Sequence, residues 1–395
     1  MADKETLVIG MVGDLLVDRE NPREAFEAVG EILVAPDILF GNLEGTYSDD
    51  PEPPPGVVIQ LFPKASNLGV FEEIGFDVLS MANNHVVDNG HAVMLDNIAR
   101  LNQAGIKTCG AGENLEAARR PAIVDANGVK VAFLAYASTF QIGHEAGPSS
   151  PGLAPYRSYD YWQPMEDNYY LPGSDPKAVS LPNEGDLRNL KEDIRLAKGA
   201  ADLVCISFHW GDYLKPFHLT EHERLTARLC IDAGADMIIG HHHHMIRGVE
   251  SYTGKPVFYG LGHLVFDLPL EMTDQIRSNF TNFENYEDPD SYHVFPREGW
   301  PLLPLHADTR MTMIAFAEIE HGQNARVGML PCRLRPNGHV EPVGIDNDEG
   351  REVIAYLEKC ITSQKLDAQL ECSDEAGLAG RKAVFIRSPV KDLSV

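Results

Sequence analysis

The 395-residue chain carries 59 acidic and 33 basic residues, so its formal net charge at pH 7 is −26. Such a negative field repels nucleic acid and long polyanions, and we expect no nucleic-acid partner. It weighs only mildly against an anionic polymer, because a local basic pocket could still hold a small anion. With 44% apolar residues, the chain is long enough for one large or two ordinary domains with a sizeable core.

The N-terminus shows no pattern of a targeting segment. Residues 1–5 lead almost directly into the first predicted strand, without the charged and apolar regions of a signal peptide. No apolar run has the length of a membrane span. The six cysteines are scattered without metal-knuckle spacing, which is typical of buried reduced thiols. We therefore expect a soluble, cytoplasmic protein without a membrane partner.

Short apolar strands alternate with amphipathic helical patterns along the chain. Apolar residues at helical spacing predict helices over 22–35, 90–104, 188–200 and 220–233. The last of these opens with Thr220 and carries Glu223 three residues later, which is the signature of a capping box. The alternation predicts a layered α/β fold.

Two long polar and aromatic stretches interrupt this alternation, at about 141–183 and 268–309. Loops of this length in a compact domain are usually functional or disordered, and aromatic content disfavours disorder. We interpret them as walls or a lid over the strand ends, with decorative packing as an equal alternative. The predicted organisation is one domain over 1–340 that contains both insertions, followed by a C-terminal helix and tail over 341–395.

Several predicted strands end in side chains of the types that bind metals. These endings are Gly13-Asp14, Asn42-Leu43-Glu44, Ala82-Asn83-Asn84-His85, His209-Trp210-Gly211-Asp212 and Gly240-His241-His242-His243-His244. One such ending would be an ordinary turn, because Asp and Asn are common turn residues. In open α/β sheets, however, ligands bind beyond the carboxyl ends of strands, and imidazole is a common ligand of zinc, manganese and iron-type ions. Taken together, these strand endings predict a metal site. For the histidine run alone, a solvated loop or a tag remnant is the alternative.

The order of these motifs resembles a known family. Together with Tyr259-Gly260-Leu261-Gly262, they are similar to the CapA family, bacterial capsule or poly-γ-glutamate synthesis proteins related to calcineurin-like metallophosphoesterases. The similarity covers roughly Leu7 to Asp267. The resemblance implies a sandwich of two β-sheets flanked by helices. Relatives of the capsule type commonly carry a membrane anchor, which the N-terminal residues do not resemble.

The resemblance also implies a set of metal ligands at the strand ends. The implied ligands are Asp14, Glu44, Asn84, His209, His242 and His244. Glu44 would bridge two divalent ions, with Asp14 and His244 on one ion and the remaining ligands on the other. The two ligand histidines could also lie one residue away within the four-histidine run. For Asp14 and Glu44, the alternative role is to cap the turns that follow them. An imidazole-rich shell suits manganese, zinc or iron better than calcium.

His85 and Asp88 are the candidate catalytic residues. His85 follows Asn84 and would lie beside the ions, where a histidine can donate a proton to a leaving group, work worth about 10²–10⁴-fold in rate. Asp88 could orient the ring of His85, and a turn-forming role before Asn89-Gly90 is the equal alternative.

The candidate substrate contacts are one histidine and three cations. His263 stands where many relatives have asparagine, and it could contact substrate, add a metal ligand, or be an ordinary polar residue at a strand end. Lys64, Lys215 and Arg247 could bind a carboxylate or phosphate, with surface charge as the alternative.

These features together predict a metal-dependent hydrolase. Its substrate would be a small amide, peptide or γ-glutamyl-type molecule. The alternatives are a phosphoesterase, or a non-catalytic accessory protein of capsule or poly-γ-glutamate assembly.

Overall fold

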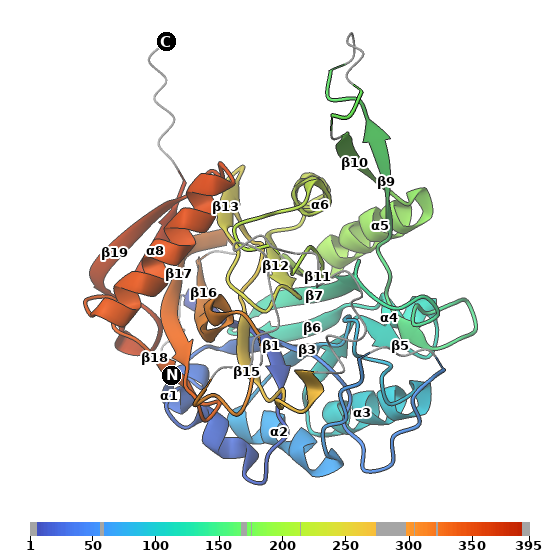
Figure 1. Ribbon diagram of the computed structural model, residues 1–395, viewed down its shortest axis with the longest axis horizontal. Coiled ribbons are helices and arrows are strands. Elements are labelled where there is room, and N and C mark those ends of the chain that lie inside the picture. Colours follow the sequence, from blue (N-terminus) through green and yellow to red (C-terminus); the bar gives the residue numbers. More distant parts are fainter. Residues whose placement is uncertain are drawn as a thin grey trace.

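The computed structural model describes residues 6–55, 59–166, 172–174, 176–213, 215–273, 298–303, 305–320 and 323–388. Two β-sheets pack face to face, and helices cover their outer faces (Figure 1). The predicted layered α/β sandwich is therefore confirmed.

The first sheet has the strand order β19-β20-β17-β16-β1-β2-β3-β4. Its strands are β1 (Thr6–Leu16), β2 (Ile38–Leu43), β3 (Val78–Ser80), β4 (Lys107–Cys109), β16 (Met311–Glu320), β17 (Gln323–Leu334), β19 (Gln369–Ala376) and β20 (Lys382–Arg387). In addition, β15 (His263–Phe266) pairs with β1, and β18 (Val340–Pro342) pairs with β17. Strands β1 to β4 run parallel, so their carboxyl ends meet at one edge of the sheet.

The second sheet has the strand order β13-β14-β12-β11-β7-β6. Its strands are β6 (Ala122–Ala126), β7 (Val129–Ala137), β11 (Leu203–His209), β12 (Met237–His241), β13 (Val249–Tyr252) and β14 (Lys255–Phe258). Strands β7, β11, β12 and β14 are parallel neighbours, so this sheet also gathers its carboxyl ends at one edge. Two short pairs stand apart from both sheets: β5 (Ala111–Gly112) with β8 (Gly152–Leu153), and β9 (Ser158–Gln163) with β10 (Lys177–Pro182).

Most predicted helices are present. They are α3 (His91–Gln103), α5 (Glu184–Ala200), α6 (Glu221–Asp232) and α8 (Asp348–Ser363). Both hydrogen bonds of the predicted capping box form at the start of α6. The other helical segments are short: η1 (Pro22–Phe26), α1 (Gly30–Leu33), η2 (Ala65–Gly69), α2 (Val70–Ile74), α4 (Leu115–Ala118), η4 (Ala307–Arg310) and η5 (Leu378–Gly380).

The prediction of one helix over 22–35 is wrong, because η1 and α1 are separate turns. No side chain caps either turn, and Gly30 disfavours a continuous helix through this stretch because its backbone loses more freedom on folding. Apolar side chains at helical spacing still face the core, since Phe26 and Ile32 are fully buried.

The core lies between the two sheets. The Phe40 ring on β2 stacks on the Phe133 ring on β7, with 5.2 Å between ring centroids. On the outer faces, α5 packs on β7 and β11, while α6 packs on β12 (Figure 1). Helix α8 contacts β17 of the first sheet and β13 of the second. This packing holds the carboxyl ends of both sets of parallel strands in fixed positions relative to each other.

The prediction of a tail after the last helix is wrong for β19 and β20, which extend the first sheet through β17. β19 is mostly exposed and polar, so it lacks the apolar alternation by which a strand is recognised in a sequence. β20 buries Val384 and Phe385 and joins β19 to the core.

The two insertions differ in structure. In the first, the hairpin β9–β10 stands out from the body of the molecule, which does not fit a wall or lid over the strand ends (Figure 1). In the second, residues 274–297 and 304 lie outside the described residues. Its described flanks include Leu268 and Leu303, which pack with Leu16 and Met245 in a small apolar cluster.

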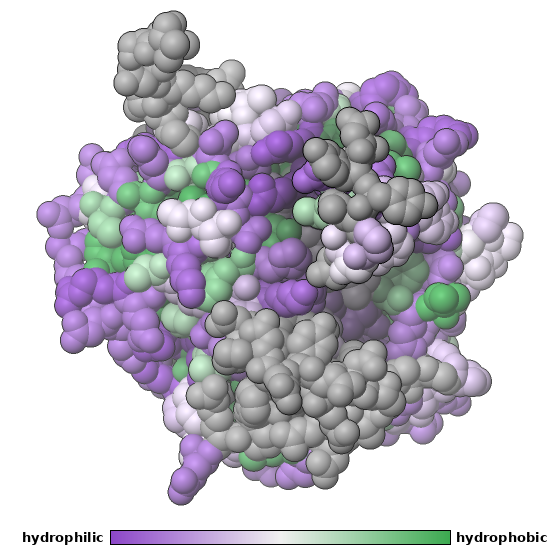
Figure 2. Space-filling model, turned by 45° about the horizontal axis from the view of Figure 1, so that its top comes forward, coloured by the Kyte–Doolittle hydropathy of each residue, from purple (hydrophilic) through white to green (hydrophobic). Residues whose placement is uncertain are grey.

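The visible surface agrees with the acidic composition, since hydrophilic residues cover much of the face in Figure 2 and hydrophobic residues form small patches. Among the described residues, none of the helices has the length and apolar character needed to cross a membrane.

Candidate metal centre

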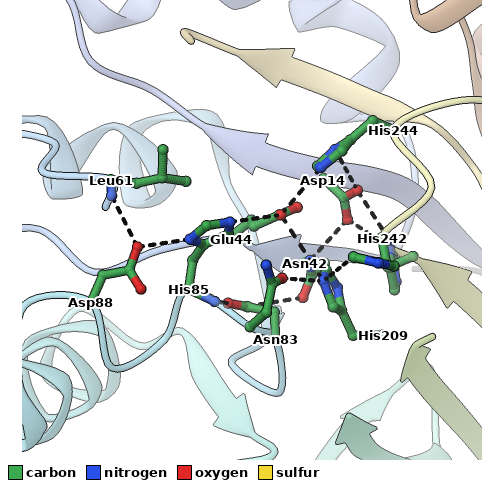
Figure 3. A network of polar contacts seen from close by, with 12 residues as sticks. Asp14, Asn42, Glu44, Leu61, Asn83, His85, Asp88, His209, His242 and His244 are labelled. Atoms are coloured by element: carbon green, nitrogen blue, oxygen red, sulfur yellow. Dashed lines mark hydrogen bonds and ion pairs between the residues drawn. The ribbon is translucent and has the colours of Figure 1, made fainter. Parts of the chain in front are cut away.

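The carboxyl ends of strands from both sheets converge on one buried polar site (Figure 3). Near the end of β1 lies Asp14, and Glu44 directly follows β2. Asn84 and His85 lie in the loop after β3, and His209 is the last residue of β11. The strand-end rule that predicted this convergence therefore holds for both sheets.

Asp14, Glu44 and His209 form the centre of this site. Each offers one ligand atom, and these three atoms all lie within 4.8 Å of one another. Asp14 and Glu44 are 0% exposed, and His209 is 1% exposed. A carboxylate–imidazole cluster this well shielded from water has the donor atoms and the enclosure that a divalent transition metal needs.

Glu44 occupies the middle of the cluster. Its Oε1 lies 3.6 Å from His244 Nε2 and 4.0 Å from His209 Nε2. Neither carboxylate oxygen has a hydrogen-bond partner among the described residues. Burial raises the pKa of Glu44 well above its usual value, and repulsion from Asp14 raises it further. Because a buried carboxylate without partners is costly, these orphaned oxygens fit a bound cation.

Asp14 is held in its charged form. Burial favours the neutral acid, but contacts with His241 and His244 outweigh it and hold the pKa of Asp14 well below its usual value. Its Oδ2 lies 3.4 Å from His244 Nδ1, and its Oδ1 lies 3.3 Å from His241 Nδ1. Asn42 Nδ2 donates a hydrogen bond of 2.9 Å to Oδ1 and so fixes the carboxylate.

A second group of donors lies beside Glu44. His209 Nε2 is 2.6 Å from Asn84 Oδ1 and 3.1 Å from His242 Nδ1. Burial lowers the pKa of both histidines well below the usual value, and neighbouring imidazoles lower it further. Both rings are therefore neutral, which is the form of imidazole that binds metal.

The four-histidine run divides its rings between two directions. His242 and His244 face the cluster around Glu44, while His243 turns away and places its Nε2 2.9 Å from Glu223 Oε1. This arrangement favours the pair His242 and His244, which the resemblance implies, over any pair that includes His243. His241 also lies beside Asp14, and neither of its ring nitrogens has a hydrogen bond to another described residue.

The ring of His85 contacts Asp88 with one nitrogen and faces the cluster with the other. His85 Nδ1 lies 2.7 Å from Asp88 Oδ2, which also accepts a hydrogen bond of 2.9 Å from the Leu61 backbone N–H. The other ring nitrogen, Nε2, lies 4.0 Å from Glu44 Oε1 (Figure 3). Asp88 is placed to orient the ring, as the sequence suggests.

His263 is completely buried at the start of β15, where it pairs in register with Asp14. Its ring centroid lies 5.9 Å from that of His244 and 5.2 Å from that of Phe266. Burial lowers the pKa of His263 to about 3, and proximity to His244 contributes. A fully buried ring does not fit a direct substrate contact. Its place behind His244 fits a residue that supports this candidate ligand from outside the site.

The three cationic candidates are dispersed. Lys64 and Lys215 are exposed on the surface. Arg247 is only 1% exposed, so the surface-charge alternative is wrong for this residue, and its guanidinium donates a hydrogen bond of 2.6 Å to the Asp212 carbonyl. None of the three makes a described contact with the cluster.

Sequence reasoning missed two polar residues around the centre. Asn42 contacts Asp14, and Glu223 contacts His243. Asn42 lies inside a recognised motif, so its role could have been suspected. The role of Glu223 depends on tertiary packing, and the sequence indicates only its capping box.

We expect His263→Asn to weaken metal affinity by about tenfold, the lower end of the range for residues that support a metal site. The reason is that His263 lies against the ring of His244, and its own side chain is fully buried and so not open to a substrate. Titration of chelator-treated protein with Zn²⁺ measures this loss. The control is His222→Asn, a buried histidine that contacts Ser138 and Ser158 instead. Unchanged affinity with a raised KM would return His263 to substrate recognition.

Comparisons with known proteins show which family the chain resembles. A family model described as bacterial capsule synthesis protein PGA_cap matches residues 8–268. Capsule biosynthesis protein CapA of Bacillus anthracis is 29% identical over 276 residues, covering 67% of this chain and 61% of that protein. A "probable polyglutamine synthesis accessory protein" of Mycobacterium tuberculosis is 30% identical over 239 residues, covering 59% of this chain and 56% of that protein. The chain thus spans less than two thirds of the length of these relatives.

A solved structure of a calcineurin-like phosphoesterase from Bacillus subtilis aligns with a TM-score of 0.39 and 12% sequence identity, covering 91% of this chain and 99% of that one. The family assignment rests on the sequence match, which includes the strands and loops that carry Asp14, Glu44, His209 and the histidine run. With more than half of its length matched by the family model, the chain belongs to the bacterial capsule synthesis protein family PGA_cap.

Proposed function

We propose that the protein is a metal-dependent hydrolase of a small amide, peptide or γ-glutamyl-type molecule. The observation that carries this proposal is the buried cluster of Asp14, Glu44 and His209, whose central carboxylate lacks hydrogen-bond partners among the described residues. The proposal includes a cytoplasmic location and a small-molecule partner in place of nucleic acid or membrane.

Two groups of side chains would hold the ions. Asp14, Glu44 and His244 form one group, and Glu44 is shared with the second group, Asn84, His209 and His242. Bound manganese, zinc or iron would supply Lewis acidity and make hydroxide available at neutral pH. The protein's own part is to gather these ligands at one place and to shield them from water.

His85 is suited to proton transfer at this site. Its Nε2 faces the cluster, and Asp88 at Nδ1 orients the ring. The side chain retains some access to solvent, since His85 is 8% exposed. His85 can therefore exchange protons with water and deliver one to a leaving group.

The cluster contains two carboxylates, and among the described residues no lysine or arginine side chain contacts it, so only the bound ions would offer positive charge to a substrate. A neighbouring pocket of about 280 Å³ has largely apolar walls, and carboxylates also line it. Its lining is Leu16, Asp18, Gln60, Leu61, Phe62, Pro63, Asp267, Pro269 and Met272. Leu61, which lines this pocket, also donates a backbone hydrogen bond to Asp88, and the pocket has the size for a small group.

A non-catalytic accessory role is the second candidate, and it is favoured by the name of the Mycobacterium tuberculosis relative. The two readings differ in their need for His85 and Asp88, because a protein that only assembles a polymer has no use for a proton donor aimed at a metal cluster.

The test is a substrate screen with the metal-reconstituted protein. Panels of γ-glutamyl amides, short peptides, carboxylic esters and phosphoesters would be assayed beside chelator-treated protein. Metal-dependent cleavage of an amide supports the proposal. Preferential cleavage of phosphoesters would establish the phosphoesterase alternative, and no turnover at full metal occupancy would favour the accessory role.

A further inference from the structure

A buried carboxylate outside the metal cluster contacts the four-histidine run. Glu223, near the start of α6, is 0% exposed, and its Oε1 lies 2.9 Å from His243 Nε2. Its Oε2 accepts hydrogen bonds of 2.7 Å from both the backbone N–H and the hydroxyl of Thr220. Both carboxylate oxygens are therefore engaged, and the capping box fixes the side chain that meets His243.

The loop after β11 closes tightly over this contact. Gly211 has a φ of +86°, and a Cβ atom there would lie 2.2 Å from His243 Nε2 and 2.8 Å from Glu223 Oε1. Only glycine fits both the conformation and the space. Because Gly211 follows His209 by two residues, the same short segment presents a candidate ligand on one side and encloses the Glu223–His243 contact on the other.

The backbone of the histidine run is strained at the two candidate ligands. His242 has a φ of +93° and His244 a φ of +56°, conformations that residues other than glycine adopt only when the surrounding structure imposes them. His243 lies between them and points to the opposite side. A firm attachment of His243 therefore stabilises the turn that directs the rings of His242 and His244 toward Glu44.

We propose that Glu223 is a positioning residue that holds His242 and His244 in their ligand geometry through its contact with His243. This inference rests on the metal site of the proposed function, and it does not depend on which bond is hydrolysed. Residues that orient metal ligands from outside the coordination sphere commonly affect metal affinity by about 10–100-fold.

The test compares Glu223→Gln with a matched control in the same protein. Glu223→Gln preserves shape but removes the charge, and we expect Zn²⁺ or Mn²⁺ affinity to fall by about 10–100-fold in calorimetric titration. We also expect a changed absorption spectrum of bound Co²⁺, because the ligand geometry relaxes. The control is Glu250→Gln on β13, a buried carboxylate that contacts Arg228 and Tyr259. It should lower unfolding stability while leaving metal affinity and the Co²⁺ spectrum unchanged.

A double-mutant cycle tests the route through His243. His243→Ala should reproduce the loss of affinity, and Glu223→Gln combined with His243→Ala should lose no more than His243→Ala alone. If Glu223→Gln does not fold, His243→Ala carries the test. Wild-type affinity and spectrum in either folded single variant would overturn the inference, as would additive losses in the double variant.

The outcomes separate this inference from the proposed function. A wild-type protein that binds metal but hydrolyses nothing would sink the hydrolase proposal and leave the role of Glu223 intact. A wild-type protein that binds no divalent metal would overturn both.

Discussion

Replacement of Glu44 by alanine should remove more bound metal than any other single substitution in the protein. Its Oε1 lies within 4.0 Å of nitrogens from His209 and His244, which belong to different groups of candidate ligands, so one side chain serves both ions. We expect metal content after desalting to fall by at least about tenfold, and elemental analysis measures it.

The controls for this prediction are substitutions of single-ion ligands. Asp14→Ala and Asn84→Ala should each retain more metal than Glu44→Ala, because each removes a donor from one ion only. Unchanged metal content in Glu44→Ala would sink the bridging assignment. Equal losses in all three variants would mean that the two ions bind as one cooperative unit, without a special role for Glu44.

His85→Ala should retain metal and lose about 10²–10⁴-fold in kcat, the contribution typical of a positioned proton donor. The basis is the contact of His85 Nδ1 with Asp88 and the direction of Nε2 toward Glu44. Steady-state kinetics on the best substrate from the screen, together with elemental analysis of the same samples, measure both quantities.

Asp88→Asn provides the matched comparison, because it keeps the shape of the side chain but removes the negative charge beside His85 Nδ1. We expect a smaller loss of kcat in the same direction, again at full metal content. Loss of metal from His85→Ala would make His85 a ligand. Full activity at full metal content would make it structural and would revive the accessory role.

The convergence of the site could be predicted because it follows from chain direction. Apolar strands that run parallel end at the same edge, so the residues after them meet whatever the details of packing. Asp14 and Glu44 lie on or beside such strands of the first sheet and His209 ends a strand of the second, so the packing of the two sheets then brings the three together.

The directions of individual rings could not be predicted in this way. The spacing of four consecutive histidines does not say which rings face Glu44, because the answer depends on left-handed backbone at His242 and His244 and on the contact of His243 with Glu223. That contact joins residues from a helix and a loop, and the sequence indicates Glu223 only as a capping residue.

Burial was also hard to predict for single polar residues. Arg247 and His263 stand beside apolar runs and could have been exposed at the strand ends, yet both are almost completely enclosed. The edge strand β19 was missed for the opposite reason, since its exposed, polar residues carry no apolar pattern. In each case, long-range packing decides burial, and local sequence does not record it.

Anomalous X-ray diffraction from crystals of the Mn²⁺-reconstituted protein tests the central claim most directly. We predict anomalous peaks in contact with Glu44, one also bound by Asp14 and His244 and the other by Asn84, His209 and His242. Peaks located away from Glu44, or none at all at saturating Mn²⁺, would contradict the assignment of this cluster as the metal centre.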